Sequence, residues 1–260
     1  MANMKIYDEI LHSYKRCVEA GLTSSMTDPA IISRGNDLQI RLKKNMTLIV
    51  TFKNVVGNIL KSLKGKYIFL LTDDEGYLLD TMCHEKILCH INFDCSIGIS
   101  FTEEAIGTNA ISMAMKLKRS VYLEPQYHYC DILKKWHCIA APIIVDEKII
   151  GYLDVSTIER DMTEEMNVVV ELLSDKIANE YKNCLKNSEL VNKNIDFTDK
   201  QIKILIMLAK GYKELTISRE LGIKPVTVKY HKKKIIEKLC VKSIQEAIVK
   251  ATKLNLIDID

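Results

Sequence analysis

The final 65 residues contain helix start and stop signals at short intervals, and these constrain the fold more than any other part of the chain. Thr198 and Gln201 have the spacing of a capping box, which begins a helix. Apolar residues then recur every three or four positions until Gly211, a residue that ends helices by adopting a positive φ. Gly222 supplies a tight turn, and Pro225 stands where the first position of a new helix tolerates a missing N–H.

The helix that begins at Pro225 has two contrasting faces. Its apolar face consists of Val228, Ile235 and Leu239. Its basic face consists of Lys229, Lys232, Lys233 and Lys234. A last helix begins at Ser243, which has the spacing of a second capping box with Glu246. Four short helices with a basic third helix form the geometry that places side chains in the major groove of DNA.

Positive charge is concentrated in the same segment. Residues 196–260 hold 14 lysines and arginines against 8 acidic residues, a net charge of +6, whereas residues 1–195 hold 23 against 26, a net charge of −3. A basic segment in an otherwise acidic chain is typical of nucleic-acid binding. No apolar run approaches the ~20 residues of a membrane span, and the first residues lack a signal-peptide pattern. We therefore expect a cytoplasmic protein without membrane contacts, whose eight cysteines are thiols.

These motifs resemble the LuxR-type helix-turn-helix family, the output domain of many bacterial transcription regulators. The chain departs from the family pattern at three positions. Gln201 replaces the usual Glu, Ser218 the usual Ala, and Lys224 the usual Ser or Thr. The last change removes a helix N-cap, a loss of roughly 1 kcal/mol that Pro225 partly offsets. The resemblance implies a regulator that binds double-stranded DNA as a homodimer.

The resemblance and the helical spacing agree on the residues that contact DNA. The side chains expected to reach base edges are Lys229, Tyr230 and Lys233. Those expected to meet phosphates are Lys224, Thr227, Lys232 and Lys234. A lysine can pair with guanine acceptors, and a good base contact discriminates by roughly 1–3 kcal/mol.

The N-terminal part alternates helical and strand patterns. Helical patterns cover residues 6–19, 37–63 and 105–118, and strand patterns cover residues 67–71, 77–80, 120–123, 137–145 and 148–155. This order predicts an antiparallel α+β sheet. Asp73 and Asp74 follow a buried strand, as in a phosphorylation receiver, but residues 73–76 suit a hairpin turn between adjacent strands better.

A long helix is expected over residues 163–185. Its apolar seam consists of Met166, Val170, Leu173, Ile177, Tyr181 and Cys184. Two interpretations stand side by side: the helix packs on its own sheet, or it forms a dimer helix leading to the DNA-binding domain. Residues 186–196, rich in Asn and Lys, are expected to be a linker.

Residues 8–180 resemble the sensor region of acetoin-catabolism-type activators, which carry a GAF domain, an AAA+ ATPase and a DNA-binding tail. The matching motifs lie at residues 10–22, 101–111, 136–143 and 150–156, and Tyr14 stands where the family usually has Trp. The sequence contains no G-x-x-x-x-G-K-S/T phosphate loop, so the ATPase module is missing. This architecture implies ordinary recruitment or blocking of RNA polymerase instead of ATP-driven promoter opening.

GAF domains bind small molecules between their sheet and the helices that cover it. The resemblance makes seven residues candidates for contact with a small-molecule effector: Phe101, Glu104, Thr108, Asn109, Tyr127, Trp136 and Cys138. In the alternative interpretation Asn109 caps a helix and Trp136 fills the core. The effector is unidentified, and a fermentation metabolite is suggested only by the resemblance.

Cysteines and histidines gather in residues 83–138. They are Cys83, His84, Cys89, His90, Cys95, His128, Cys130, His137 and Cys138. Thiolate and imidazole groups are ligands of zinc, copper and iron clusters, so a metal- or redox-responsive regulator is the alternative hypothesis. Because no C-x-x-C pair occurs and buried Cys often acts as a small hydrophobe, we assign no metal ligand and no cofactor. Some GAF domains reduce methionine sulfoxide with cysteines, but no motif here places a thiol beside an obvious acid, and we expect no enzyme.

The expected organisation has four parts. They are an N-terminal helical region (1–62), a GAF-like sensor domain (63–160), a connecting or dimerisation helix with its linker (161–196) and a four-helix DNA-binding domain (197–260).

Overall fold

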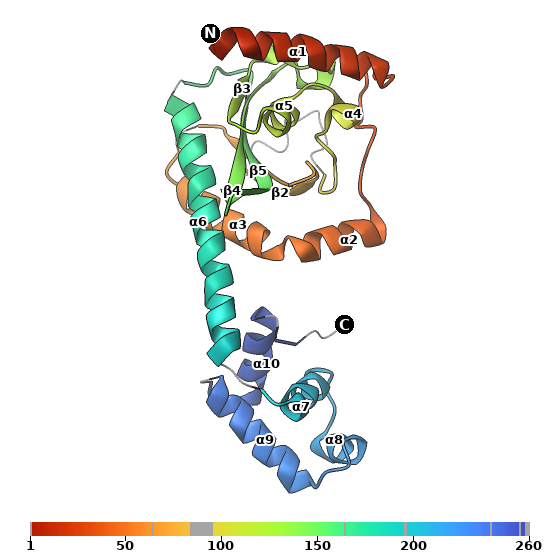
Figure 1. Ribbon diagram of the computed structural model, residues 1–260, viewed down its shortest axis with the longest axis vertical. Coiled ribbons are helices and arrows are strands. Elements are labelled where there is room, and N and C mark those ends of the chain that lie inside the picture. Colours follow the sequence, from red (N-terminus) through yellow and green to blue (C-terminus); the bar gives the residue numbers. More distant parts are fainter. Residues whose placement is uncertain are drawn as a thin grey trace. The chain divides into compact units, whose positions relative to one another are not determined.

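The computed structural model describes residues 2–63, 65–83, 96–163, 165–194, 197–239, 241–254 and 256–257. The chain divides into two compact units, Met1–Lys182 and Asn183–Asp260, whose elements are labelled in Figure 1. Within the described ranges, no helix is both long and apolar enough to cross a membrane. The expected fold class is confirmed: an antiparallel α+β unit with a long helix, and an all-α unit.

The first unit is built on a five-stranded antiparallel sheet with the strand order β2-β1-β5-β4-β3. The strands are β1 (Ile68–Asp73), β2 (Leu78–Cys83), β3 (Val121–Leu123), β4 (Trp136–Val145) and β5 (Lys148–Ile158). The turn between β4 and β5 is formed by Asp146 and Glu147, with φ of 47° and 65°. Two successive left-handed residues are typical of a type I′ turn, whose twist matches that of the strands it joins.

The turn between β1 and β2 is organised by Asp73. Its Oδ1 accepts hydrogen bonds from the backbone N–H groups of Glu75 (3.1 Å) and Tyr77 (2.9 Å). Arg41 pairs with the same carboxylate at 2.5 Å and lies over the Tyr77 ring, 3.8 Å from its centroid. Asp73 therefore has a structural role, and the hairpin interpretation of residues 73–76 is confirmed.

One face of the sheet is covered by α1 (Ala2–Glu19), α4 (Glu103–Ile106) and α5 (Ala110–Leu117) (Figure 1). Side chains alternate between the faces of a strand, so Cys138 and Ala140 of β4 lie on this side with Leu70 of β1. The face is more polar than the opposite one, because Asp154 and Ser156 of β5 are also buried.

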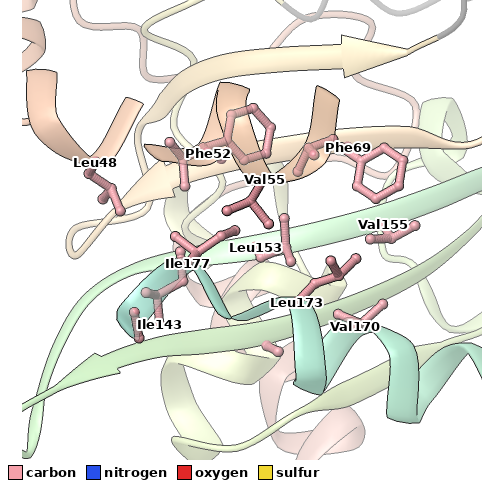
Figure 2. Packing of buried hydrophobic residues seen from close by; sticks show 14 of the residues in the cluster. Leu48, Phe52, Val55, Phe69, Ile143, Leu153, Val155, Val170, Leu173 and Ile177 are labelled. Carbon is pink, nitrogen blue, oxygen red and sulfur yellow. The ribbon is translucent and has the colours of Figure 1, made fainter. Parts of the chain in front are cut away.

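The opposite face is covered by α3 (Met46–Leu60) and α6 (Glu165–Asn194). Figure 2 shows Phe52 of α3 and Leu173 of α6 among the side chains that gather around Leu153 of β5. Four residues of the expected seam on the long helix are buried here: Met166, Val170, Leu173 and Ile177. The seam therefore packs on the sheet of its own chain, as one of the two interpretations predicted.

Two of the expected helical patterns are each divided into two helices, although residues 105–118 are helical for most of their length as expected, and the long helix extends further than expected. The helical pattern of residues 37–63 forms two helices, α2 (Gly35–Lys44) and α3, because Asn45 leaves helical geometry at φ −101°, ψ 12°. The pattern of residues 105–118 is interrupted at Gly107, where φ is 72°, between α4 and α5. The long helix continues to Asn194, so most of the expected linker is helical; this stretch has no Gly or Pro that would end a helix.

The second unit consists of α7 (Asp199–Ala209), α8 (Glu214–Glu220), α9 (Pro225–Lys238) and α10 (Ile244–Lys253). The capping box of Thr198 and Gln201 is confirmed in both directions, at 3.2 and 3.3 Å. Gly211 and Gly222 have φ of 82° and 61°, as the turns require. Around them lies a core of Ile204, Leu205, Ile217, Val228, Ile235, Leu239, Ala247, Ala251 and Ile257.

The second expected capping box is only half formed. Ser243 accepts a hydrogen bond from the backbone N–H of Glu246 at 3.1 Å. The Glu246 carboxylate accepts from the backbone N–H of Lys242 at 3.0 Å, one residue earlier than the motif requires. The helix is still capped, because both groups satisfy N–H donors near its start.

Candidate functional site

The exposed face of α9 is the candidate nucleic-acid interface. Val228 and Ile235 are buried on one side of this helix, which fixes the opposite side toward solvent. Lys229, Tyr230 and Lys233 lie on that opposite side and are exposed, with 58% of Tyr230 accessible. All three residues expected to reach base edges therefore share one open helical face.

The sequence reasoning missed Val226, which lies on the same face of α9. It is 69% exposed, although valine is apolar and the helix has a buried core beside it. Val226, Lys229, Tyr230 and Lys233 follow the three- and four-residue steps of one helical stripe. The sequence did contain a signal for Val226, because it is the second residue of the helix that begins at Pro225. The next two residues, Thr227 and Val228, were both given roles.

The residues expected to meet phosphates differ in their surroundings. Lys224 is exposed and Thr227 partly exposed at the start of α9, where Lys224 supplies no side-chain cap, as predicted. Lys232 pairs with Glu214 of α8 at 2.5 Å, so it joins two helices of the unit. Lys234 pairs with Glu237 at 2.7 Å, one turn further along α9.

The far end of α9 is held to the start of α7. Lys238 Nζ donates a hydrogen bond to Gln201 Oε1 at 2.9 Å and lies 5.5 Å from the centroid of the Phe197 ring. Gln201, which replaces the family's usual Glu, thus serves the capping box and the α9 anchor together. Its double role links the C-terminal end of α9 to the start of α7.

The candidate effector site of the first unit is a small cavity between the sheet and α5. It is lined by Leu70, Phe101, Asn109, Ala110, Ile111, His128, Leu133, Trp136, Cys138, Asp154 and Ser156, and its volume is about 10 Å³. A cavity of this size holds about one water molecule. Four of the seven expected effector residues line it: Phe101, Asn109, Trp136 and Cys138.

Three polar side chains of the cavity are connected across neighbouring strands. Ser156 Oγ lies 2.5 Å from Asp154 Oδ1 and 3.2 Å from Cys138 Sγ. Burial raises the pKa of Asp154 to about 7, while the hydrogen bond from Ser156 opposes this change. The carboxyl group is therefore close to half-ionised at neutral pH.

His128 is a further ionisable side chain on the cavity lining, and the sequence did not predict its place there. Its side chain is fully buried, and burial lowers its pKa to about 4, so the ring is neutral at pH 7. The backbone groups of Pro125 and Glu124 favour its charged form, yet neither ring nitrogen has a hydrogen-bond partner of good geometry among the described residues. An unsatisfied buried imidazole of this kind is unusual in a folded protein.

The remaining expected effector residues lie elsewhere. Thr108 is buried and its Oγ1 lies 2.6 Å from Ser13 Oγ of α1, which ties that helix to the domain. Glu104 is exposed on α4. Tyr127 lines a separate open groove of about 620 Å³ between α1, β3 and the start of α6.

Asn109 caps a helix, as its alternative interpretation predicted, and also lines the cavity. Its Oδ1 accepts from the backbone N–H of Ser112 at 3.0 Å. Its Nδ2 donates to the carbonyl oxygens of Phe101 (2.9 Å) and Gly107 (2.8 Å). These bonds occupy the side-chain amide with the local backbone.

The Cys/His cluster is described only in part. His84, Cys89, His90 and Cys95 lie outside the described residues. Within the described ranges, no group of three or more His, Cys, Asp or Glu side chains has an arrangement that could hold a metal ion. His137 instead bonds through Nδ1 to the Tyr122 hydroxyl at 2.9 Å, and Cys130 is buried.

Comparison with known families identifies a domain type in each of the two units. The family model of bacterial regulatory proteins of the luxR family matches residues 196–251, and the GAF domain model matches residues 47–181. A chain of the E. coli DhaR(N)–DhaL complex superposes with a TM-score of 0.62 at 16% identity, over 71% of this chain and 63% of that one. At this identity the likeness concerns the fold alone.

Two relatives can each be aligned with 58% of the chain. The acetoin dehydrogenase operon transcriptional activator AcoR of Bacillus subtilis (strain 168) is 29% identical over 157 residues, 58% of this chain and 26% of that protein. A signal-transduction and transcriptional-control protein of Clostridium beijerinckii is 26% identical over 155 residues, 58% of this chain and 24% of that protein. The chain thus spans about a quarter of the length of these relatives. Since the GAF model covers more than half of its residues, the chain belongs to the GAF domain family, and its C-terminal unit is a LuxR-type helix-turn-helix domain of the bacterial regulatory proteins.

Proposed function

We propose that the chain is a transcription regulator that binds a specific sequence of double-stranded DNA and responds to a small molecule in its GAF cavity. The observation that carries the DNA-binding part is the exposed stripe of α9, in which two lysines and a tyrosine face solvent opposite a buried apolar face. The two relatives are named as a transcriptional activator and a transcriptional-control protein, which supports the same function.

The four residues of this stripe read the bases in the major groove. Lys229 and Lys233 donate to guanine acceptors, and the Val226 methyl groups contact the methyl group of a thymine. Lys224 and Thr227 at the start of α9 bind phosphates and set the position of the helix on the duplex. Lys232 and Lys234 contribute weaker phosphate contacts, because Glu214 and Glu237 already pair with them.

The sensing part rests on the cavity between the sheet and α5. Its walls are apolar at Phe101 and Trp136 and polar at His128, Asp154 and Ser156, a combination typical of sites that orient small polar molecules. Its described lining contains no Lys or Arg, so the effector is not a strong anion.

The regulator acts as a homodimer and contacts RNA polymerase directly. Val168 and Leu172 of α6 are exposed by 57% and 62% on the side away from the sheet, and such apolar residues four positions apart suit a helix–helix contact between two copies.

The experiment compares two lysine variants of the full chain on a DNA duplex selected by the wild type from a random pool. Lys233→Ala relaxes the preference at one base pair and costs roughly 1–3 kcal/mol on the preferred duplex. Lys224→Ala lowers affinity for all duplexes evenly and reduces the salt dependence of binding by about one phosphate contact. An equal loss of specificity in both variants would overturn the division of roles, and unchanged binding in both would overturn the interface.

A further inference from the structure

The cavity contains a hydrogen-bonded chain that joins a thiol to a carboxyl group. Cys138 and Ser156 face each other in register across β4 and β5, and Asp154 lies two residues before Ser156 on the same side of β5. Ser156 Oγ is within hydrogen-bond distance of both other groups, at 3.2 Å from Cys138 Sγ and 2.5 Å from Asp154 Oδ1.

A hydroxyl group has one hydrogen, so Ser156 donates to one neighbour and accepts from the other. When Asp154 is ionised, the Cys138 thiol donates to Ser156, which donates to the carboxylate. When Asp154 is protonated, both bonds run in the opposite direction and Ser156 donates to Cys138 Sγ. When the thiol itself supplies the proton, the proton passes through Ser156 to the ionised carboxylate, and this transfer leaves a nucleophilic thiolate on Cys138.

His128 completes the chemistry of this cavity. Its buried ring is neutral, and neither nitrogen has a hydrogen-bond partner of good geometry among the described residues, although Asp154 and Ser156 also line the cavity. A neutral imidazole on the cavity lining can donate its N–H to an oxygen atom that gains negative charge beside it. The titratable side chains on the described lining are His128, Cys138 and Asp154, and no described cation competes with them.

We propose that Cys138 captures a one- or two-carbon aldehyde as a reversible covalent adduct, and that this adduct is the signal of the regulator. The inference rests on the proposed function and names the ligand class of the same cavity. Cys138 Sγ forms a bond to the carbonyl carbon while the C=O π bond opens. The thiol proton passes through Ser156 to Asp154 and then to the new oxygen, which gives a neutral hemithioacetal. No oxidant or reductant is needed, because thiol and aldehyde together contain all atoms of the product.

The size of the cavity selects the smallest aldehydes. A volume of about 10 Å³ admits about one water-sized molecule. A covalent S–C bond brings the carbon well inside the ~3.5–4.0 Å of a nonbonded contact, so an adduct requires less free space than the same molecule held without a bond. Formaldehyde, with two heavy atoms, comes closer to this limit than acetaldehyde, whose methyl group needs additional space among the neighbouring side chains.

The test adds ¹³C-labelled formaldehyde to the full chain and records the carbon signal of an S–CH₂–OH group, which differs from that of adducts on lysine nitrogen. The wild type gives one sulfur-bound signal that saturates at lower formaldehyde concentration than the signals of its other thiols and disappears on dilution. Cys138→Ser and Cys138→Ala lose it, whereas Cys184→Ser, which removes an exposed thiol on α6, keeps it. Survival of this low-concentration signal in both Cys138 variants, or its absence from the wild type, overturns the proposal.

Two further readouts separate the role of the relay from a merely structural one. Asp154→Asn keeps the shape of the side chain and slows adduct formation by about a hundredfold, in the range of general acid–base effects. In the wild type the rate rises with pH to a midpoint near 7, the pKa of Asp154, and an unchanged rate in Asp154→Asn overturns the relay.

DNA affinity of the same samples separates this proposal from the proposed function. If the adduct forms but the selected duplex binds equally well with and without formaldehyde, the adduct is not the signal. A chain that forms the adduct and binds no duplex overturns the proposed function itself.

Discussion

Replacing Asp154 with Asn removes a buried acid while keeping a side chain of the same shape that can still accept from Ser156. The pKa of Asp154 is 3.8 in an unfolded chain and about 7 in the folded protein, so the folded state holds the proton more tightly. Stability therefore falls as pH rises between these two values. The full difference corresponds to about 4 kcal/mol, and about 2.5 kcal/mol of it develops between about pH 5 and pH 8.

The assay is urea unfolding of the wild type and Asp154→Asn at both pH values, with fluorescence of Trp136 as the probe, since Trp136 lines the same cavity. The stability advantage of Asn over Asp should be about 2.5 kcal/mol larger at about pH 8 than at about pH 5. A pH-independent difference between the two proteins would refute the reasoning, because it would show that Asp154 does not titrate between its folded and unfolded values. A difference that shrinks with pH would mean that the folded state favours the ionised form.

The remaining predictions concern single side chains with matched controls. The wild type should lose about 2.5 kcal/mol of stability through His128 as pH falls from about 6.5 to about 4, because a ring with a folded pKa of about 4 becomes charged on unfolding. His128→Gln should remove this loss, and an unchanged acid transition contradicts the prediction. Leu173→Ala should cost ~2–5 kcal/mol of unfolding free energy, because Leu173 is 4% exposed, and Asp175→Ala on the exposed side of the same helix should cost less than ~0.5 kcal/mol. Equal effects would show that α6 does not pack as described. Thr198→Ala should destabilise the helix-turn-helix unit by roughly 1 kcal/mol in thermal unfolding, and Thr252→Ala, on the exposed side of α10, serves as its control.

The sequence allowed good predictions wherever structure depends on neighbouring residues. Thr198, Gln201, Gly211 and Pro225 specify caps and turns through their own backbone preferences, and the structure has all of them in these roles. The apolar seam of α6 likewise follows from helical spacing alone, because one face of a helix must be buried.

Predictions failed where local signals were weak. Asn45 interrupts a helical pattern without Gly or Pro, and its side chain bonds back to the Arg41 carbonyl at 3.0 Å, an option that spacing does not reveal. The polar composition of residues 186–194 resembled a linker, but the helix continues through them because no residue there ends it.

The two candidate sites could be predicted from the sequence to different extents. The stripe on α9 depends on one helix, so periodicity sufficed for its lysines, although not for the exposed Val226. The cavity brings together His128, Cys138 and Asp154 from separate segments, and their contact depends on strand register across β4 and β5. Spacing along the chain does not contain that information, so only the folded structure shows that Asp154 and His128 line the cavity.

The central claim is that the exposed stripe of α9 reads a specific DNA sequence, and selection from a random duplex pool tests it most directly. The full chain and a variant with Val226, Lys229 and Lys233 replaced by Ala are each carried through the same rounds, with folding of the variant verified by its thermal transition. The wild type should enrich one defined motif, and the variant should bind weakly with no enriched sequence. Enrichment of the same motif by both proteins, or of no motif by the wild type, would contradict the account.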